Sequence, residues 1–218
     1  MIEYLQPTQT IECDHEEIRE FARRHADNSA TPREQAISLF YAVRDSIRYD
    51  PYSFELSMEN LRASTTLRTG RGFCIPKAIL FTACCRSVGI PARIGFADVR
   101  NHISTARMRE QLKTDVFFWH AYTSIYLNGV WVKATATFNI ELCHKFRIKP
   151  LDFNGHEDAL FHPFDLTGNQ HMEYILYRGE FADVPLNQII ETHLEHGLAL
   201  SLNNANFDLD VEQETSSD

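Results

Sequence analysis

The most regular apolar pattern in the chain follows Cys74. From there, buried-type residues recur at three- and four-residue steps, and Gly89 and Pro91 come directly after them. Such spacing is typical of one buried helix face, and the glycine and proline end the helix. The sequence therefore predicts a buried helix that begins at Cys74, with its apolar face formed by Ala78, Phe81, Thr82, Cys85 and Val88.

Other helices are predicted by their end signals. One is expected to begin at Asp14, with Glu17 three residues later. A second begins at Thr31, because Thr31, Pro32 and Glu34 combine a cap, a first-turn proline and a capping-box acid. Helices are further predicted at 183–197, where apolar residues recur with helical spacing, and, as short elements, at 59–62 and 141–146.

Alternating residues predict β-strands in the second half of the chain. Residues 116–137 form two strands joined by Asn128 and Gly129, a strong hairpin signal. Further strands are expected at 92–99 and, at a sheet edge, at 171–178. In the first hairpin strand the period of two places His120 with Tyr122 on a polar-aromatic face and leaves the opposite face to be buried, so an exposed His120 is expected.

Composition indicates one globular domain with a tail. The 218 residues are 44% hydrophobic and include 15 phenylalanines, enough for a core. We expect a single domain over 1–202 and a disordered acidic tail over 203–218, which carries five acidic residues and no Lys or Arg. Without them the net charge of −9 becomes −4, and no basic patch indicates nucleic-acid binding.

Cysteine usage and the N-terminus indicate the compartment. The five cysteines form no C-x-x-C pair and no even framework, which favours reduced thiols. The N-terminus has acidic residues and lacks the apolar core of a secretory signal, and no stretch approaches the ~20 apolar residues of a membrane helix. We therefore expect a cytoplasmic protein that is not bound to a membrane.

Cys74 is the main candidate for chemistry. A thiol in the first turn of a helix lies beside unpaired backbone N–H groups and the positive end of the helix dipole, which favours its thiolate. Lys77 would add to this field if its side chain turned toward the sulfur. His120, on a later strand, supplies a base that only folding can bring to the thiol.

Other histidines give weaker signals. His156, Asp158, His162, Asp165 and His171 resemble a loose group of metal ligands, but their spacing fits no metal-binding template. We therefore predict no metal and no cofactor. The two histidines of the 183–197 helix, His193 and His196, are explained as helix-end cations near the negative end of the dipole.

Several motifs together resemble the transglutaminase-like superfamily. Gly70, Gly72 and Cys74 are followed by the apolar helix and by the run GIPAR at 89–93. Then come His120-Ala121-Tyr122 on a strand and a hairpin with Gly129, Trp131 and Val132. The resemblance covers roughly residues 35–140. It implies a papain-like α+β fold, with helices packed on an antiparallel sheet, Cys74 as the nucleophile at a helix N-terminus and His120 as its base.

The chain departs from this family at one position. The family usually has an aspartate four residues after the tryptophan, where this sequence has Thr135. The period of two places Thr135, Thr137 and Asn139 on one face of the second hairpin strand. The third member of the triad is therefore Thr135 by alignment, or Asn139 by chemistry, because Cys-His-Asn triads also occur.

The resemblance implies a thiol enzyme that acts on an amide or peptide bond of a peptide, a protein or a small amide. Hydrolysis or deamidation is favoured over cross-linking, and transfer from a small ester or thioester to an amine is a further form of the same chemistry. The absence of an aspartate at Thr135 supports a different hypothesis, in which the protein is non-catalytic and its cleft binds a peptide or protein partner.

Overall fold

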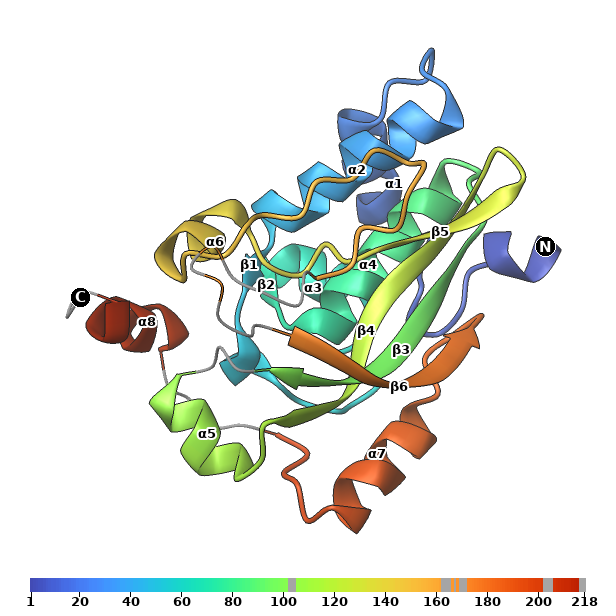
Figure 1. The fold of residues 1–218 in the computed structure, drawn as a ribbon. Helices are drawn as coiled ribbons and strands as arrows, with labels where there is room; N and C mark the ends of the chain where they lie inside the picture. Colours follow the sequence, from blue (N-terminus) through green and yellow to red (C-terminus); the bar gives the residue numbers. More distant parts are fainter. Residues whose placement is uncertain (102–104, 162–165, 167, 169–171, 202–205, 216–218) are drawn as a thin grey trace.

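The computed structural model describes residues 1–101, 105–161, 166, 168, 172–201 and 206–215. Its centre is a four-stranded sheet in the order β5-β4-β3-β6, in which every neighbouring pair is antiparallel. Helices pack against this sheet, so the predicted α+β class, with helices on an antiparallel sheet, is confirmed (Figure 1). The strands are β3 (Ala92–Asn101), β4 (Val116–Leu127), β5 (Val130–Ala134) and β6 (Met172–Phe181).

Helix α4 (Cys74–Ser87) is the central helix of the layer that covers one side of the sheet. It lies against β3 and β4, and every residue from Ile75 to Arg86 is buried. Its predicted start at Cys74 is confirmed, and Gly89 follows its end with a left-handed φ of 80°. Three helices surround α4: α1 (Glu16–His25), α2 (Pro32–Ser46) and α3 (Ala63–Thr69).

The N-terminal ends of these helices follow local chemistry. Thr31 and Glu34 form the predicted capping box of α2. The cap of α1 is His15 instead of Asp14, because Nδ1 of His15 accepts the N–H of Glu17. The short helix expected at 59–62 is absent there, and the segment forms α3 slightly later in the chain.

Smaller elements connect and border these layers. Two short strands, β1 and β2, pair in parallel just before α4. Helix α6 occupies most of the predicted 141–146 segment, and α7 most of 183–197. The elements are η1 (Ile2–Leu5), β1 (Arg48–Tyr49), η2 (Pro51–Ser53), β2 (Arg71–Gly72), α5 (Ala106–Leu112), α6 (Ile140–Lys145), α7 (Leu186–Glu195) and α8 (Phe207–Thr215).

The predicted hairpin forms, but its second strand is shorter than expected. Asn128 and Gly129 both have positive φ, as the turn between β4 and β5 requires. Strand β5 ends at Ala134, so Thr135 and Asn139 do not lie in the strand as predicted. The reason is that Ala159 bridges Ala134 in parallel and accepts the N–H of Thr135 at 2.9 Å, which redirects the chain.

Strand β4 contains an irregular residue directly before His120. Trp119 has a φ of 57°, in the left-handed region, and the pairing of β3 with β4 shifts between Ala97 and Val99. The backbone N–H of Trp119 still has a hydrogen-bond acceptor at this bulge, because it donates to Oδ1 of Asp98 at 3.1 Å. Arg178 on β6 holds the same carboxylate through two hydrogen bonds. The bulge is thus built from three neighbouring strands.

The acidic C-terminal segment contains a helix where disorder is predicted. Residues 207–215 form α8, and its Phe207 and Val211 are buried. Phe207 makes edge contacts with Tyr49 and Tyr52, while Asp210 accepts from the hydroxyl of Tyr52 at 2.6 Å. The two buried apolar residues and the hydrogen bonds and ion pairs of the acidic side chains together hold this short helix against the domain.

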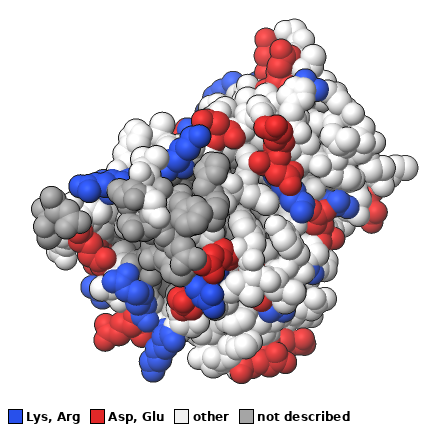
Figure 2. Space-filling view, in the orientation of Figure 1, with Lys and Arg blue, Asp and Glu red and all other residues white. Residues whose placement is uncertain are grey.

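The surface shows no field of a single charge on the face in Figure 2, where acidic and basic side chains are interspersed. Within the described residues, no helix is both long and apolar enough to cross a bilayer.

Candidate functional site

Cys74 occupies the first position of α4, directly after Phe73 at the helix cap. As a residue Cys74 is half-buried, whereas the other cysteines, Cys13, Cys84, Cys85 and Cys143, are fully buried. The backbone N–H groups of Ala121, Ile75 and Cys74 itself lie close enough to lower its pKa. A helix start and the neighbouring strand thus both direct amide hydrogens at one sulfur.

These amides do not make the thiol acidic. Burial raises the pKa of Cys74 to about 11, and this effect is larger than that of the three N–H groups. The helix start favours the thiolate as expected, but in the free protein burial outweighs this effect. At neutral pH Cys74 is a neutral thiol that needs a base.

Lys77 does not contribute the expected positive charge near the sulfur. Its side chain is fully buried and points to the end of α2, where the ammonium donates to the carbonyl oxygens of Arg44 and Ile47. Burial lowers the pKa of Lys77 to about 7. The condition for its contribution is not met, because the carbonyl groups at the end of α2 hold the ammonium.

His120 follows the Trp119 bulge on β4 and is only 5% exposed. The predicted alternation is present, since Thr123 on the opposite face donates to the carbonyl of Ala78 on α4. The expectation of an exposed His120 is nevertheless wrong. Its face of the sheet is covered by the segment that carries Phe161, whose ring lies 5.8 Å from the imidazole between centroids.

The two candidates for the third member have different environments. The Thr135 hydroxyl is buried, and it lies close enough to the Tyr174 hydroxyl to lower the pKa of that tyrosine. Asn139 accepts the N–H of Tyr49 through its side-chain oxygen at 3.1 Å and donates to Glu141 at 2.9 Å. Asn139 thus links β1 to α6. Neither side chain forms a hydrogen bond with His120 in the described part of the chain.

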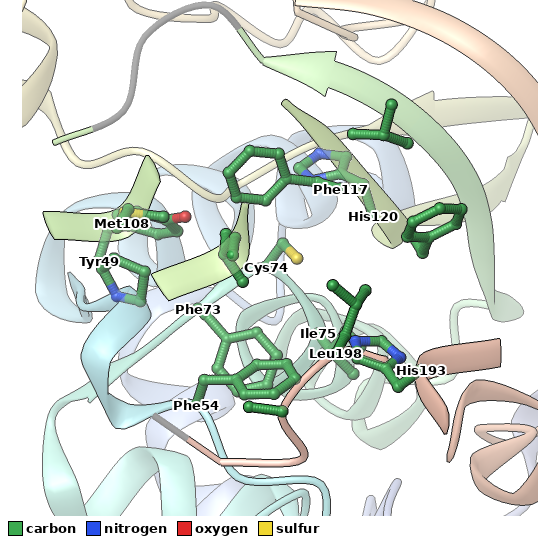
Figure 3. Close-up of a pocket in the computed structure, with 15 residues that line it drawn as sticks. Tyr49, Phe54, Phe73, Cys74, Ile75, Met108, Phe117, His120, His193 and Leu198 are labelled. Atoms are coloured by element: carbon green, nitrogen blue, oxygen red, sulfur yellow. The ribbon is translucent and has the colours of Figure 1, made fainter. Parts of the chain in front are cut away.

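One pocket brings the main candidates together. Cys74 and His120 line it, and the sulfur and the imidazole occupy neighbouring parts of its wall (Figure 3). Its cavity volume is about 70 Å³. Apart from Tyr49, Cys74 and two histidines, the described lining residues are apolar: Pro51, Phe54, Phe73, Ile75, Met108, Leu112, Val116, Phe117, Phe118, Leu198 and Ala199.

The second histidine of this pocket is His193, for which the sequence predicts the role of a helix-end cation. It is instead 7% exposed and stacks on Phe54, with ring centroids 5.6 Å apart. Its position could have been found from spacing, because Leu186, Ile189 and His193 follow each other at three- and four-residue steps. His196, on the same helix, stacks on Phe118.

The residues of the loose metal-ligand group have other surroundings. Asp158 accepts the backbone N–H of Lys133 at 2.8 Å, and His156 is exposed. His162, Asp165 and His171 lie outside the described residues. Within the part that is described, no three metal-ligating side chains form a group that could hold an ion.

Comparison with solved structures finds a similar fold. A “putative cysteine protease” from Cytophaga hutchinsonii has a TM-score of 0.53 and 17% sequence identity over 84% of this chain. The match covers 47% of that protein, so this chain spans about half its length. A “putative protease” from Parabacteroides distasonis has a TM-score of 0.40 and 16% identity, covering 56% of this chain and 23% of the other. No curated protein matches the sequence.

A cysteine at the start of a helix, packed on an antiparallel sheet that carries a histidine, defines the papain-like class of α+β proteins. The sequence pattern of the transglutaminase-like superfamily matches residues 19–136, more than half of the chain. The chain belongs to this superfamily, as the motifs around Cys74 and His120 predict.

Proposed function

We propose that the protein is a thiol enzyme that cleaves or transfers an acyl group at an amide or peptide bond. One observation carries this proposal: Cys74 and His120, far apart in the sequence, line the same pocket. The family membership and the fold support the pairing. Cys74 is the nucleophile and His120 the general base.

The raised pKa of Cys74 determines the order of the steps. Since the thiol is neutral at pH 7, its proton passes to His120 as the sulfur attacks the acyl carbon, and not before. The N–H of Cys74, at the start of α4, stabilises the oxygen that becomes negative. The C–N bond then breaks, the amine leaves with the proton from His120, and a thioester remains on Cys74.

Water or an amine then releases the acyl group. Water enters through the open mouth of the pocket and is deprotonated by His120 as it attacks the thioester, which restores the thiol. We therefore propose hydrolysis or deamidation as the main outcome, with transfer to an amine as the minor one. The acceptor does not change the roles of the two side chains.

Acylation by p-nitrophenyl acetate tests the chemistry without knowledge of the natural substrate. We expect a burst of p-nitrophenolate and an acetyl adduct on Cys74 by mass spectrometry, both absent in Cys74→Ala. Preferential alkylation of Cys74 is not a sufficient test, because the other four thiols are buried. Its alkylation rate with iodoacetamide should instead be compared with that of N-acetylcysteine.

A non-catalytic protein that binds a peptide is the second candidate. It is favoured by the raised pKa of Cys74 and by Thr135, whose hydroxyl cannot supply the charge of an aspartate. A buried thiol without a base, with a pKa of about 11 against an ordinary value of 9.0, would be alkylated about 100-fold more slowly than a free thiol at pH 7. That slow rate, with no acetyl adduct, would contradict the enzymatic proposal and favour the binding function.

A further inference from the structure

The pocket beside Cys74 contains a second histidine, His193, that the proposed reaction does not use. Three aromatic rings, which we call the aromatic row, extend along its wall from the nucleophile: Phe73, Phe54 and His193. The rings of Phe73 and Phe54 are 4.9 Å apart, and those of Phe54 and His193 are 5.6 Å apart and inclined by only 25°. Since Phe73 precedes Cys74 in the chain, the row connects His193 to the thiol.

The protonation of His193 is fixed by its own helix. Nδ1 lies 2.9 Å from the carbonyl oxygen of Ile189. A carbonyl oxygen can only accept, so Nδ1 carries the proton and the neutral ring has Nε2 as an acceptor. Burial also lowers the pKa of His193, which favours the neutral form. Nε2 forms no hydrogen bond within the described residues, on a side chain that lines the pocket.

The rest of the lining restricts what can bind there. No Asp, Glu, Lys or Arg is found among the described lining residues. A charged group would therefore lose its hydration without a partner of opposite charge, whereas a flat apolar group would be buried against rings. Among the described side chains of the lining, the acceptor on His193 is the polar contact that remains for such a ligand apart from the reacting pair and Tyr49.

We propose that His193 is a specificity-determining residue that accepts the N–H of a secondary amide, whose flat apolar substituent lies on the aromatic row. The inference rests on the proposed function, because it defines the amide presented to Cys74. It predicts substrates with an aromatic or similarly flat neutral group next to the amide. Amides with a charged group at this position bind poorly.

Binding of N-benzylacetamide tests this proposal, since the molecule has one ring and one N–H. Its dissociation constant would be measured by ligand-observed NMR and compared with that of N-benzyl-N-methylacetamide, which lacks the N–H. For the wild-type protein we expect the loss of the N–H to weaken binding about tenfold, as for one hydrogen bond of ~1.4 kcal/mol. In His193→Phe, which keeps a ring on Phe54, this ratio should fall below about twofold.

Two further variants complete the design. His193→Gln retains an acceptor and should keep part of the preference for the N–H, whereas His196→Phe, on the same helix, should leave the ratio unchanged. An equal ratio in wild type and His193→Phe, or no binding of N-benzylacetamide to the wild type, would overturn the proposal. Acylation of Cys74 by p-nitrophenyl acetate needs no amide N–H, so it separates this failure from a failure of the proposed function.

Discussion

The two walls of the pocket are held in different ways. The α4–β4 wall, with Cys74 and His120, lies within the region that matches the family, and α4 is buried against the sheet along its length. The α7 wall, with His193 and Leu198, follows that region. It is anchored at a few points, among them a 2.9 Å hydrogen bond from Nε1 of Trp119 to the Thr192 hydroxyl. Our proposals thus assign the chemistry to the α4–β4 wall and the recognition to the α7 wall.

The largest predicted effect tests the α4–β4 wall. Replacement of His120 by Gln removes the base, and we expect the acylation rate of Cys74 by p-nitrophenyl acetate to fall about 10²- to 10⁴-fold at pH 7. Because the pKa of Cys74 is about 11, the rate of the variant should then rise about tenfold per pH unit up to pH 9. Single-turnover release of p-nitrophenolate measures both.

The matched control is His196→Gln on the α7 wall, which should acylate at the wild-type rate. If His120→Gln kept the wild-type rate and pH profile, the base would have to be another group. The assignment of the general base to the α4–β4 wall would then be wrong.

A smaller effect comes from the ammonium buried beneath the α4–β4 wall. The pKa of Lys77 is about 7 in the folded protein, below its ordinary value of 10.5, because burial disfavours the charge. Between these two pH values the unfolded chain binds more protons, so folding becomes more favourable as the pH rises. From pH 7 to pH 9 we expect Lys77 to add about 2 kcal/mol to the free energy of unfolding.

The measurement is chemical denaturation of wild type and Lys77→Met at both pH values. The free energy of unfolding of the wild type, minus that of Lys77→Met, should grow by that amount from pH 7 to pH 9. The buried cysteines have raised pKa values, which favour the unfolded chain at high pH. Because both proteins contain these cysteines, their contribution cancels in the difference. Lys77→Gln serves as a second variant. A difference that does not change with pH would contradict the lowered pKa, because it would mean that Lys77 stays charged in the folded protein at both pH values.

Local signals in the sequence were sufficient to predict the start of α2, the start of α4 and the β4–β5 hairpin, but not the burial of His120. The start of α4 at Cys74, the capping box at Thr31 and the Asn128-Gly129 turn all depend on residues a few positions apart. Such signals have the same physical cause in any fold. They define the elements that carry Cys74 and His120.

What the sequence could not show depends on distant segments. Lys77 turns to carbonyl groups of α2, and Thr135 leaves the sheet because Ala159 pairs with its backbone. The spacing of His193 indicates a buried helix face, but only the packing of α7 shows that this face borders the pocket with Cys74. These outcomes require contacts that no local pattern specifies.

The smallest predicted effect comes from removing the hydrogen bond between Trp119 and Thr192, which joins the two walls. Trp119 is 3% exposed, so Thr192→Val leaves its indole N–H buried without an acceptor. We expect the free energy of unfolding to fall by about 1–2 kcal/mol, while Thr192→Ser keeps the hydroxyl and most of the stability. Binding of N-benzylacetamide should weaken a few-fold in Thr192→Val, with acylation by p-nitrophenyl acetate unchanged within about twofold. Because Trp119 directly precedes His120, an equal loss of acylation would mean that α7 also positions the base, and that the pocket acts as one unit.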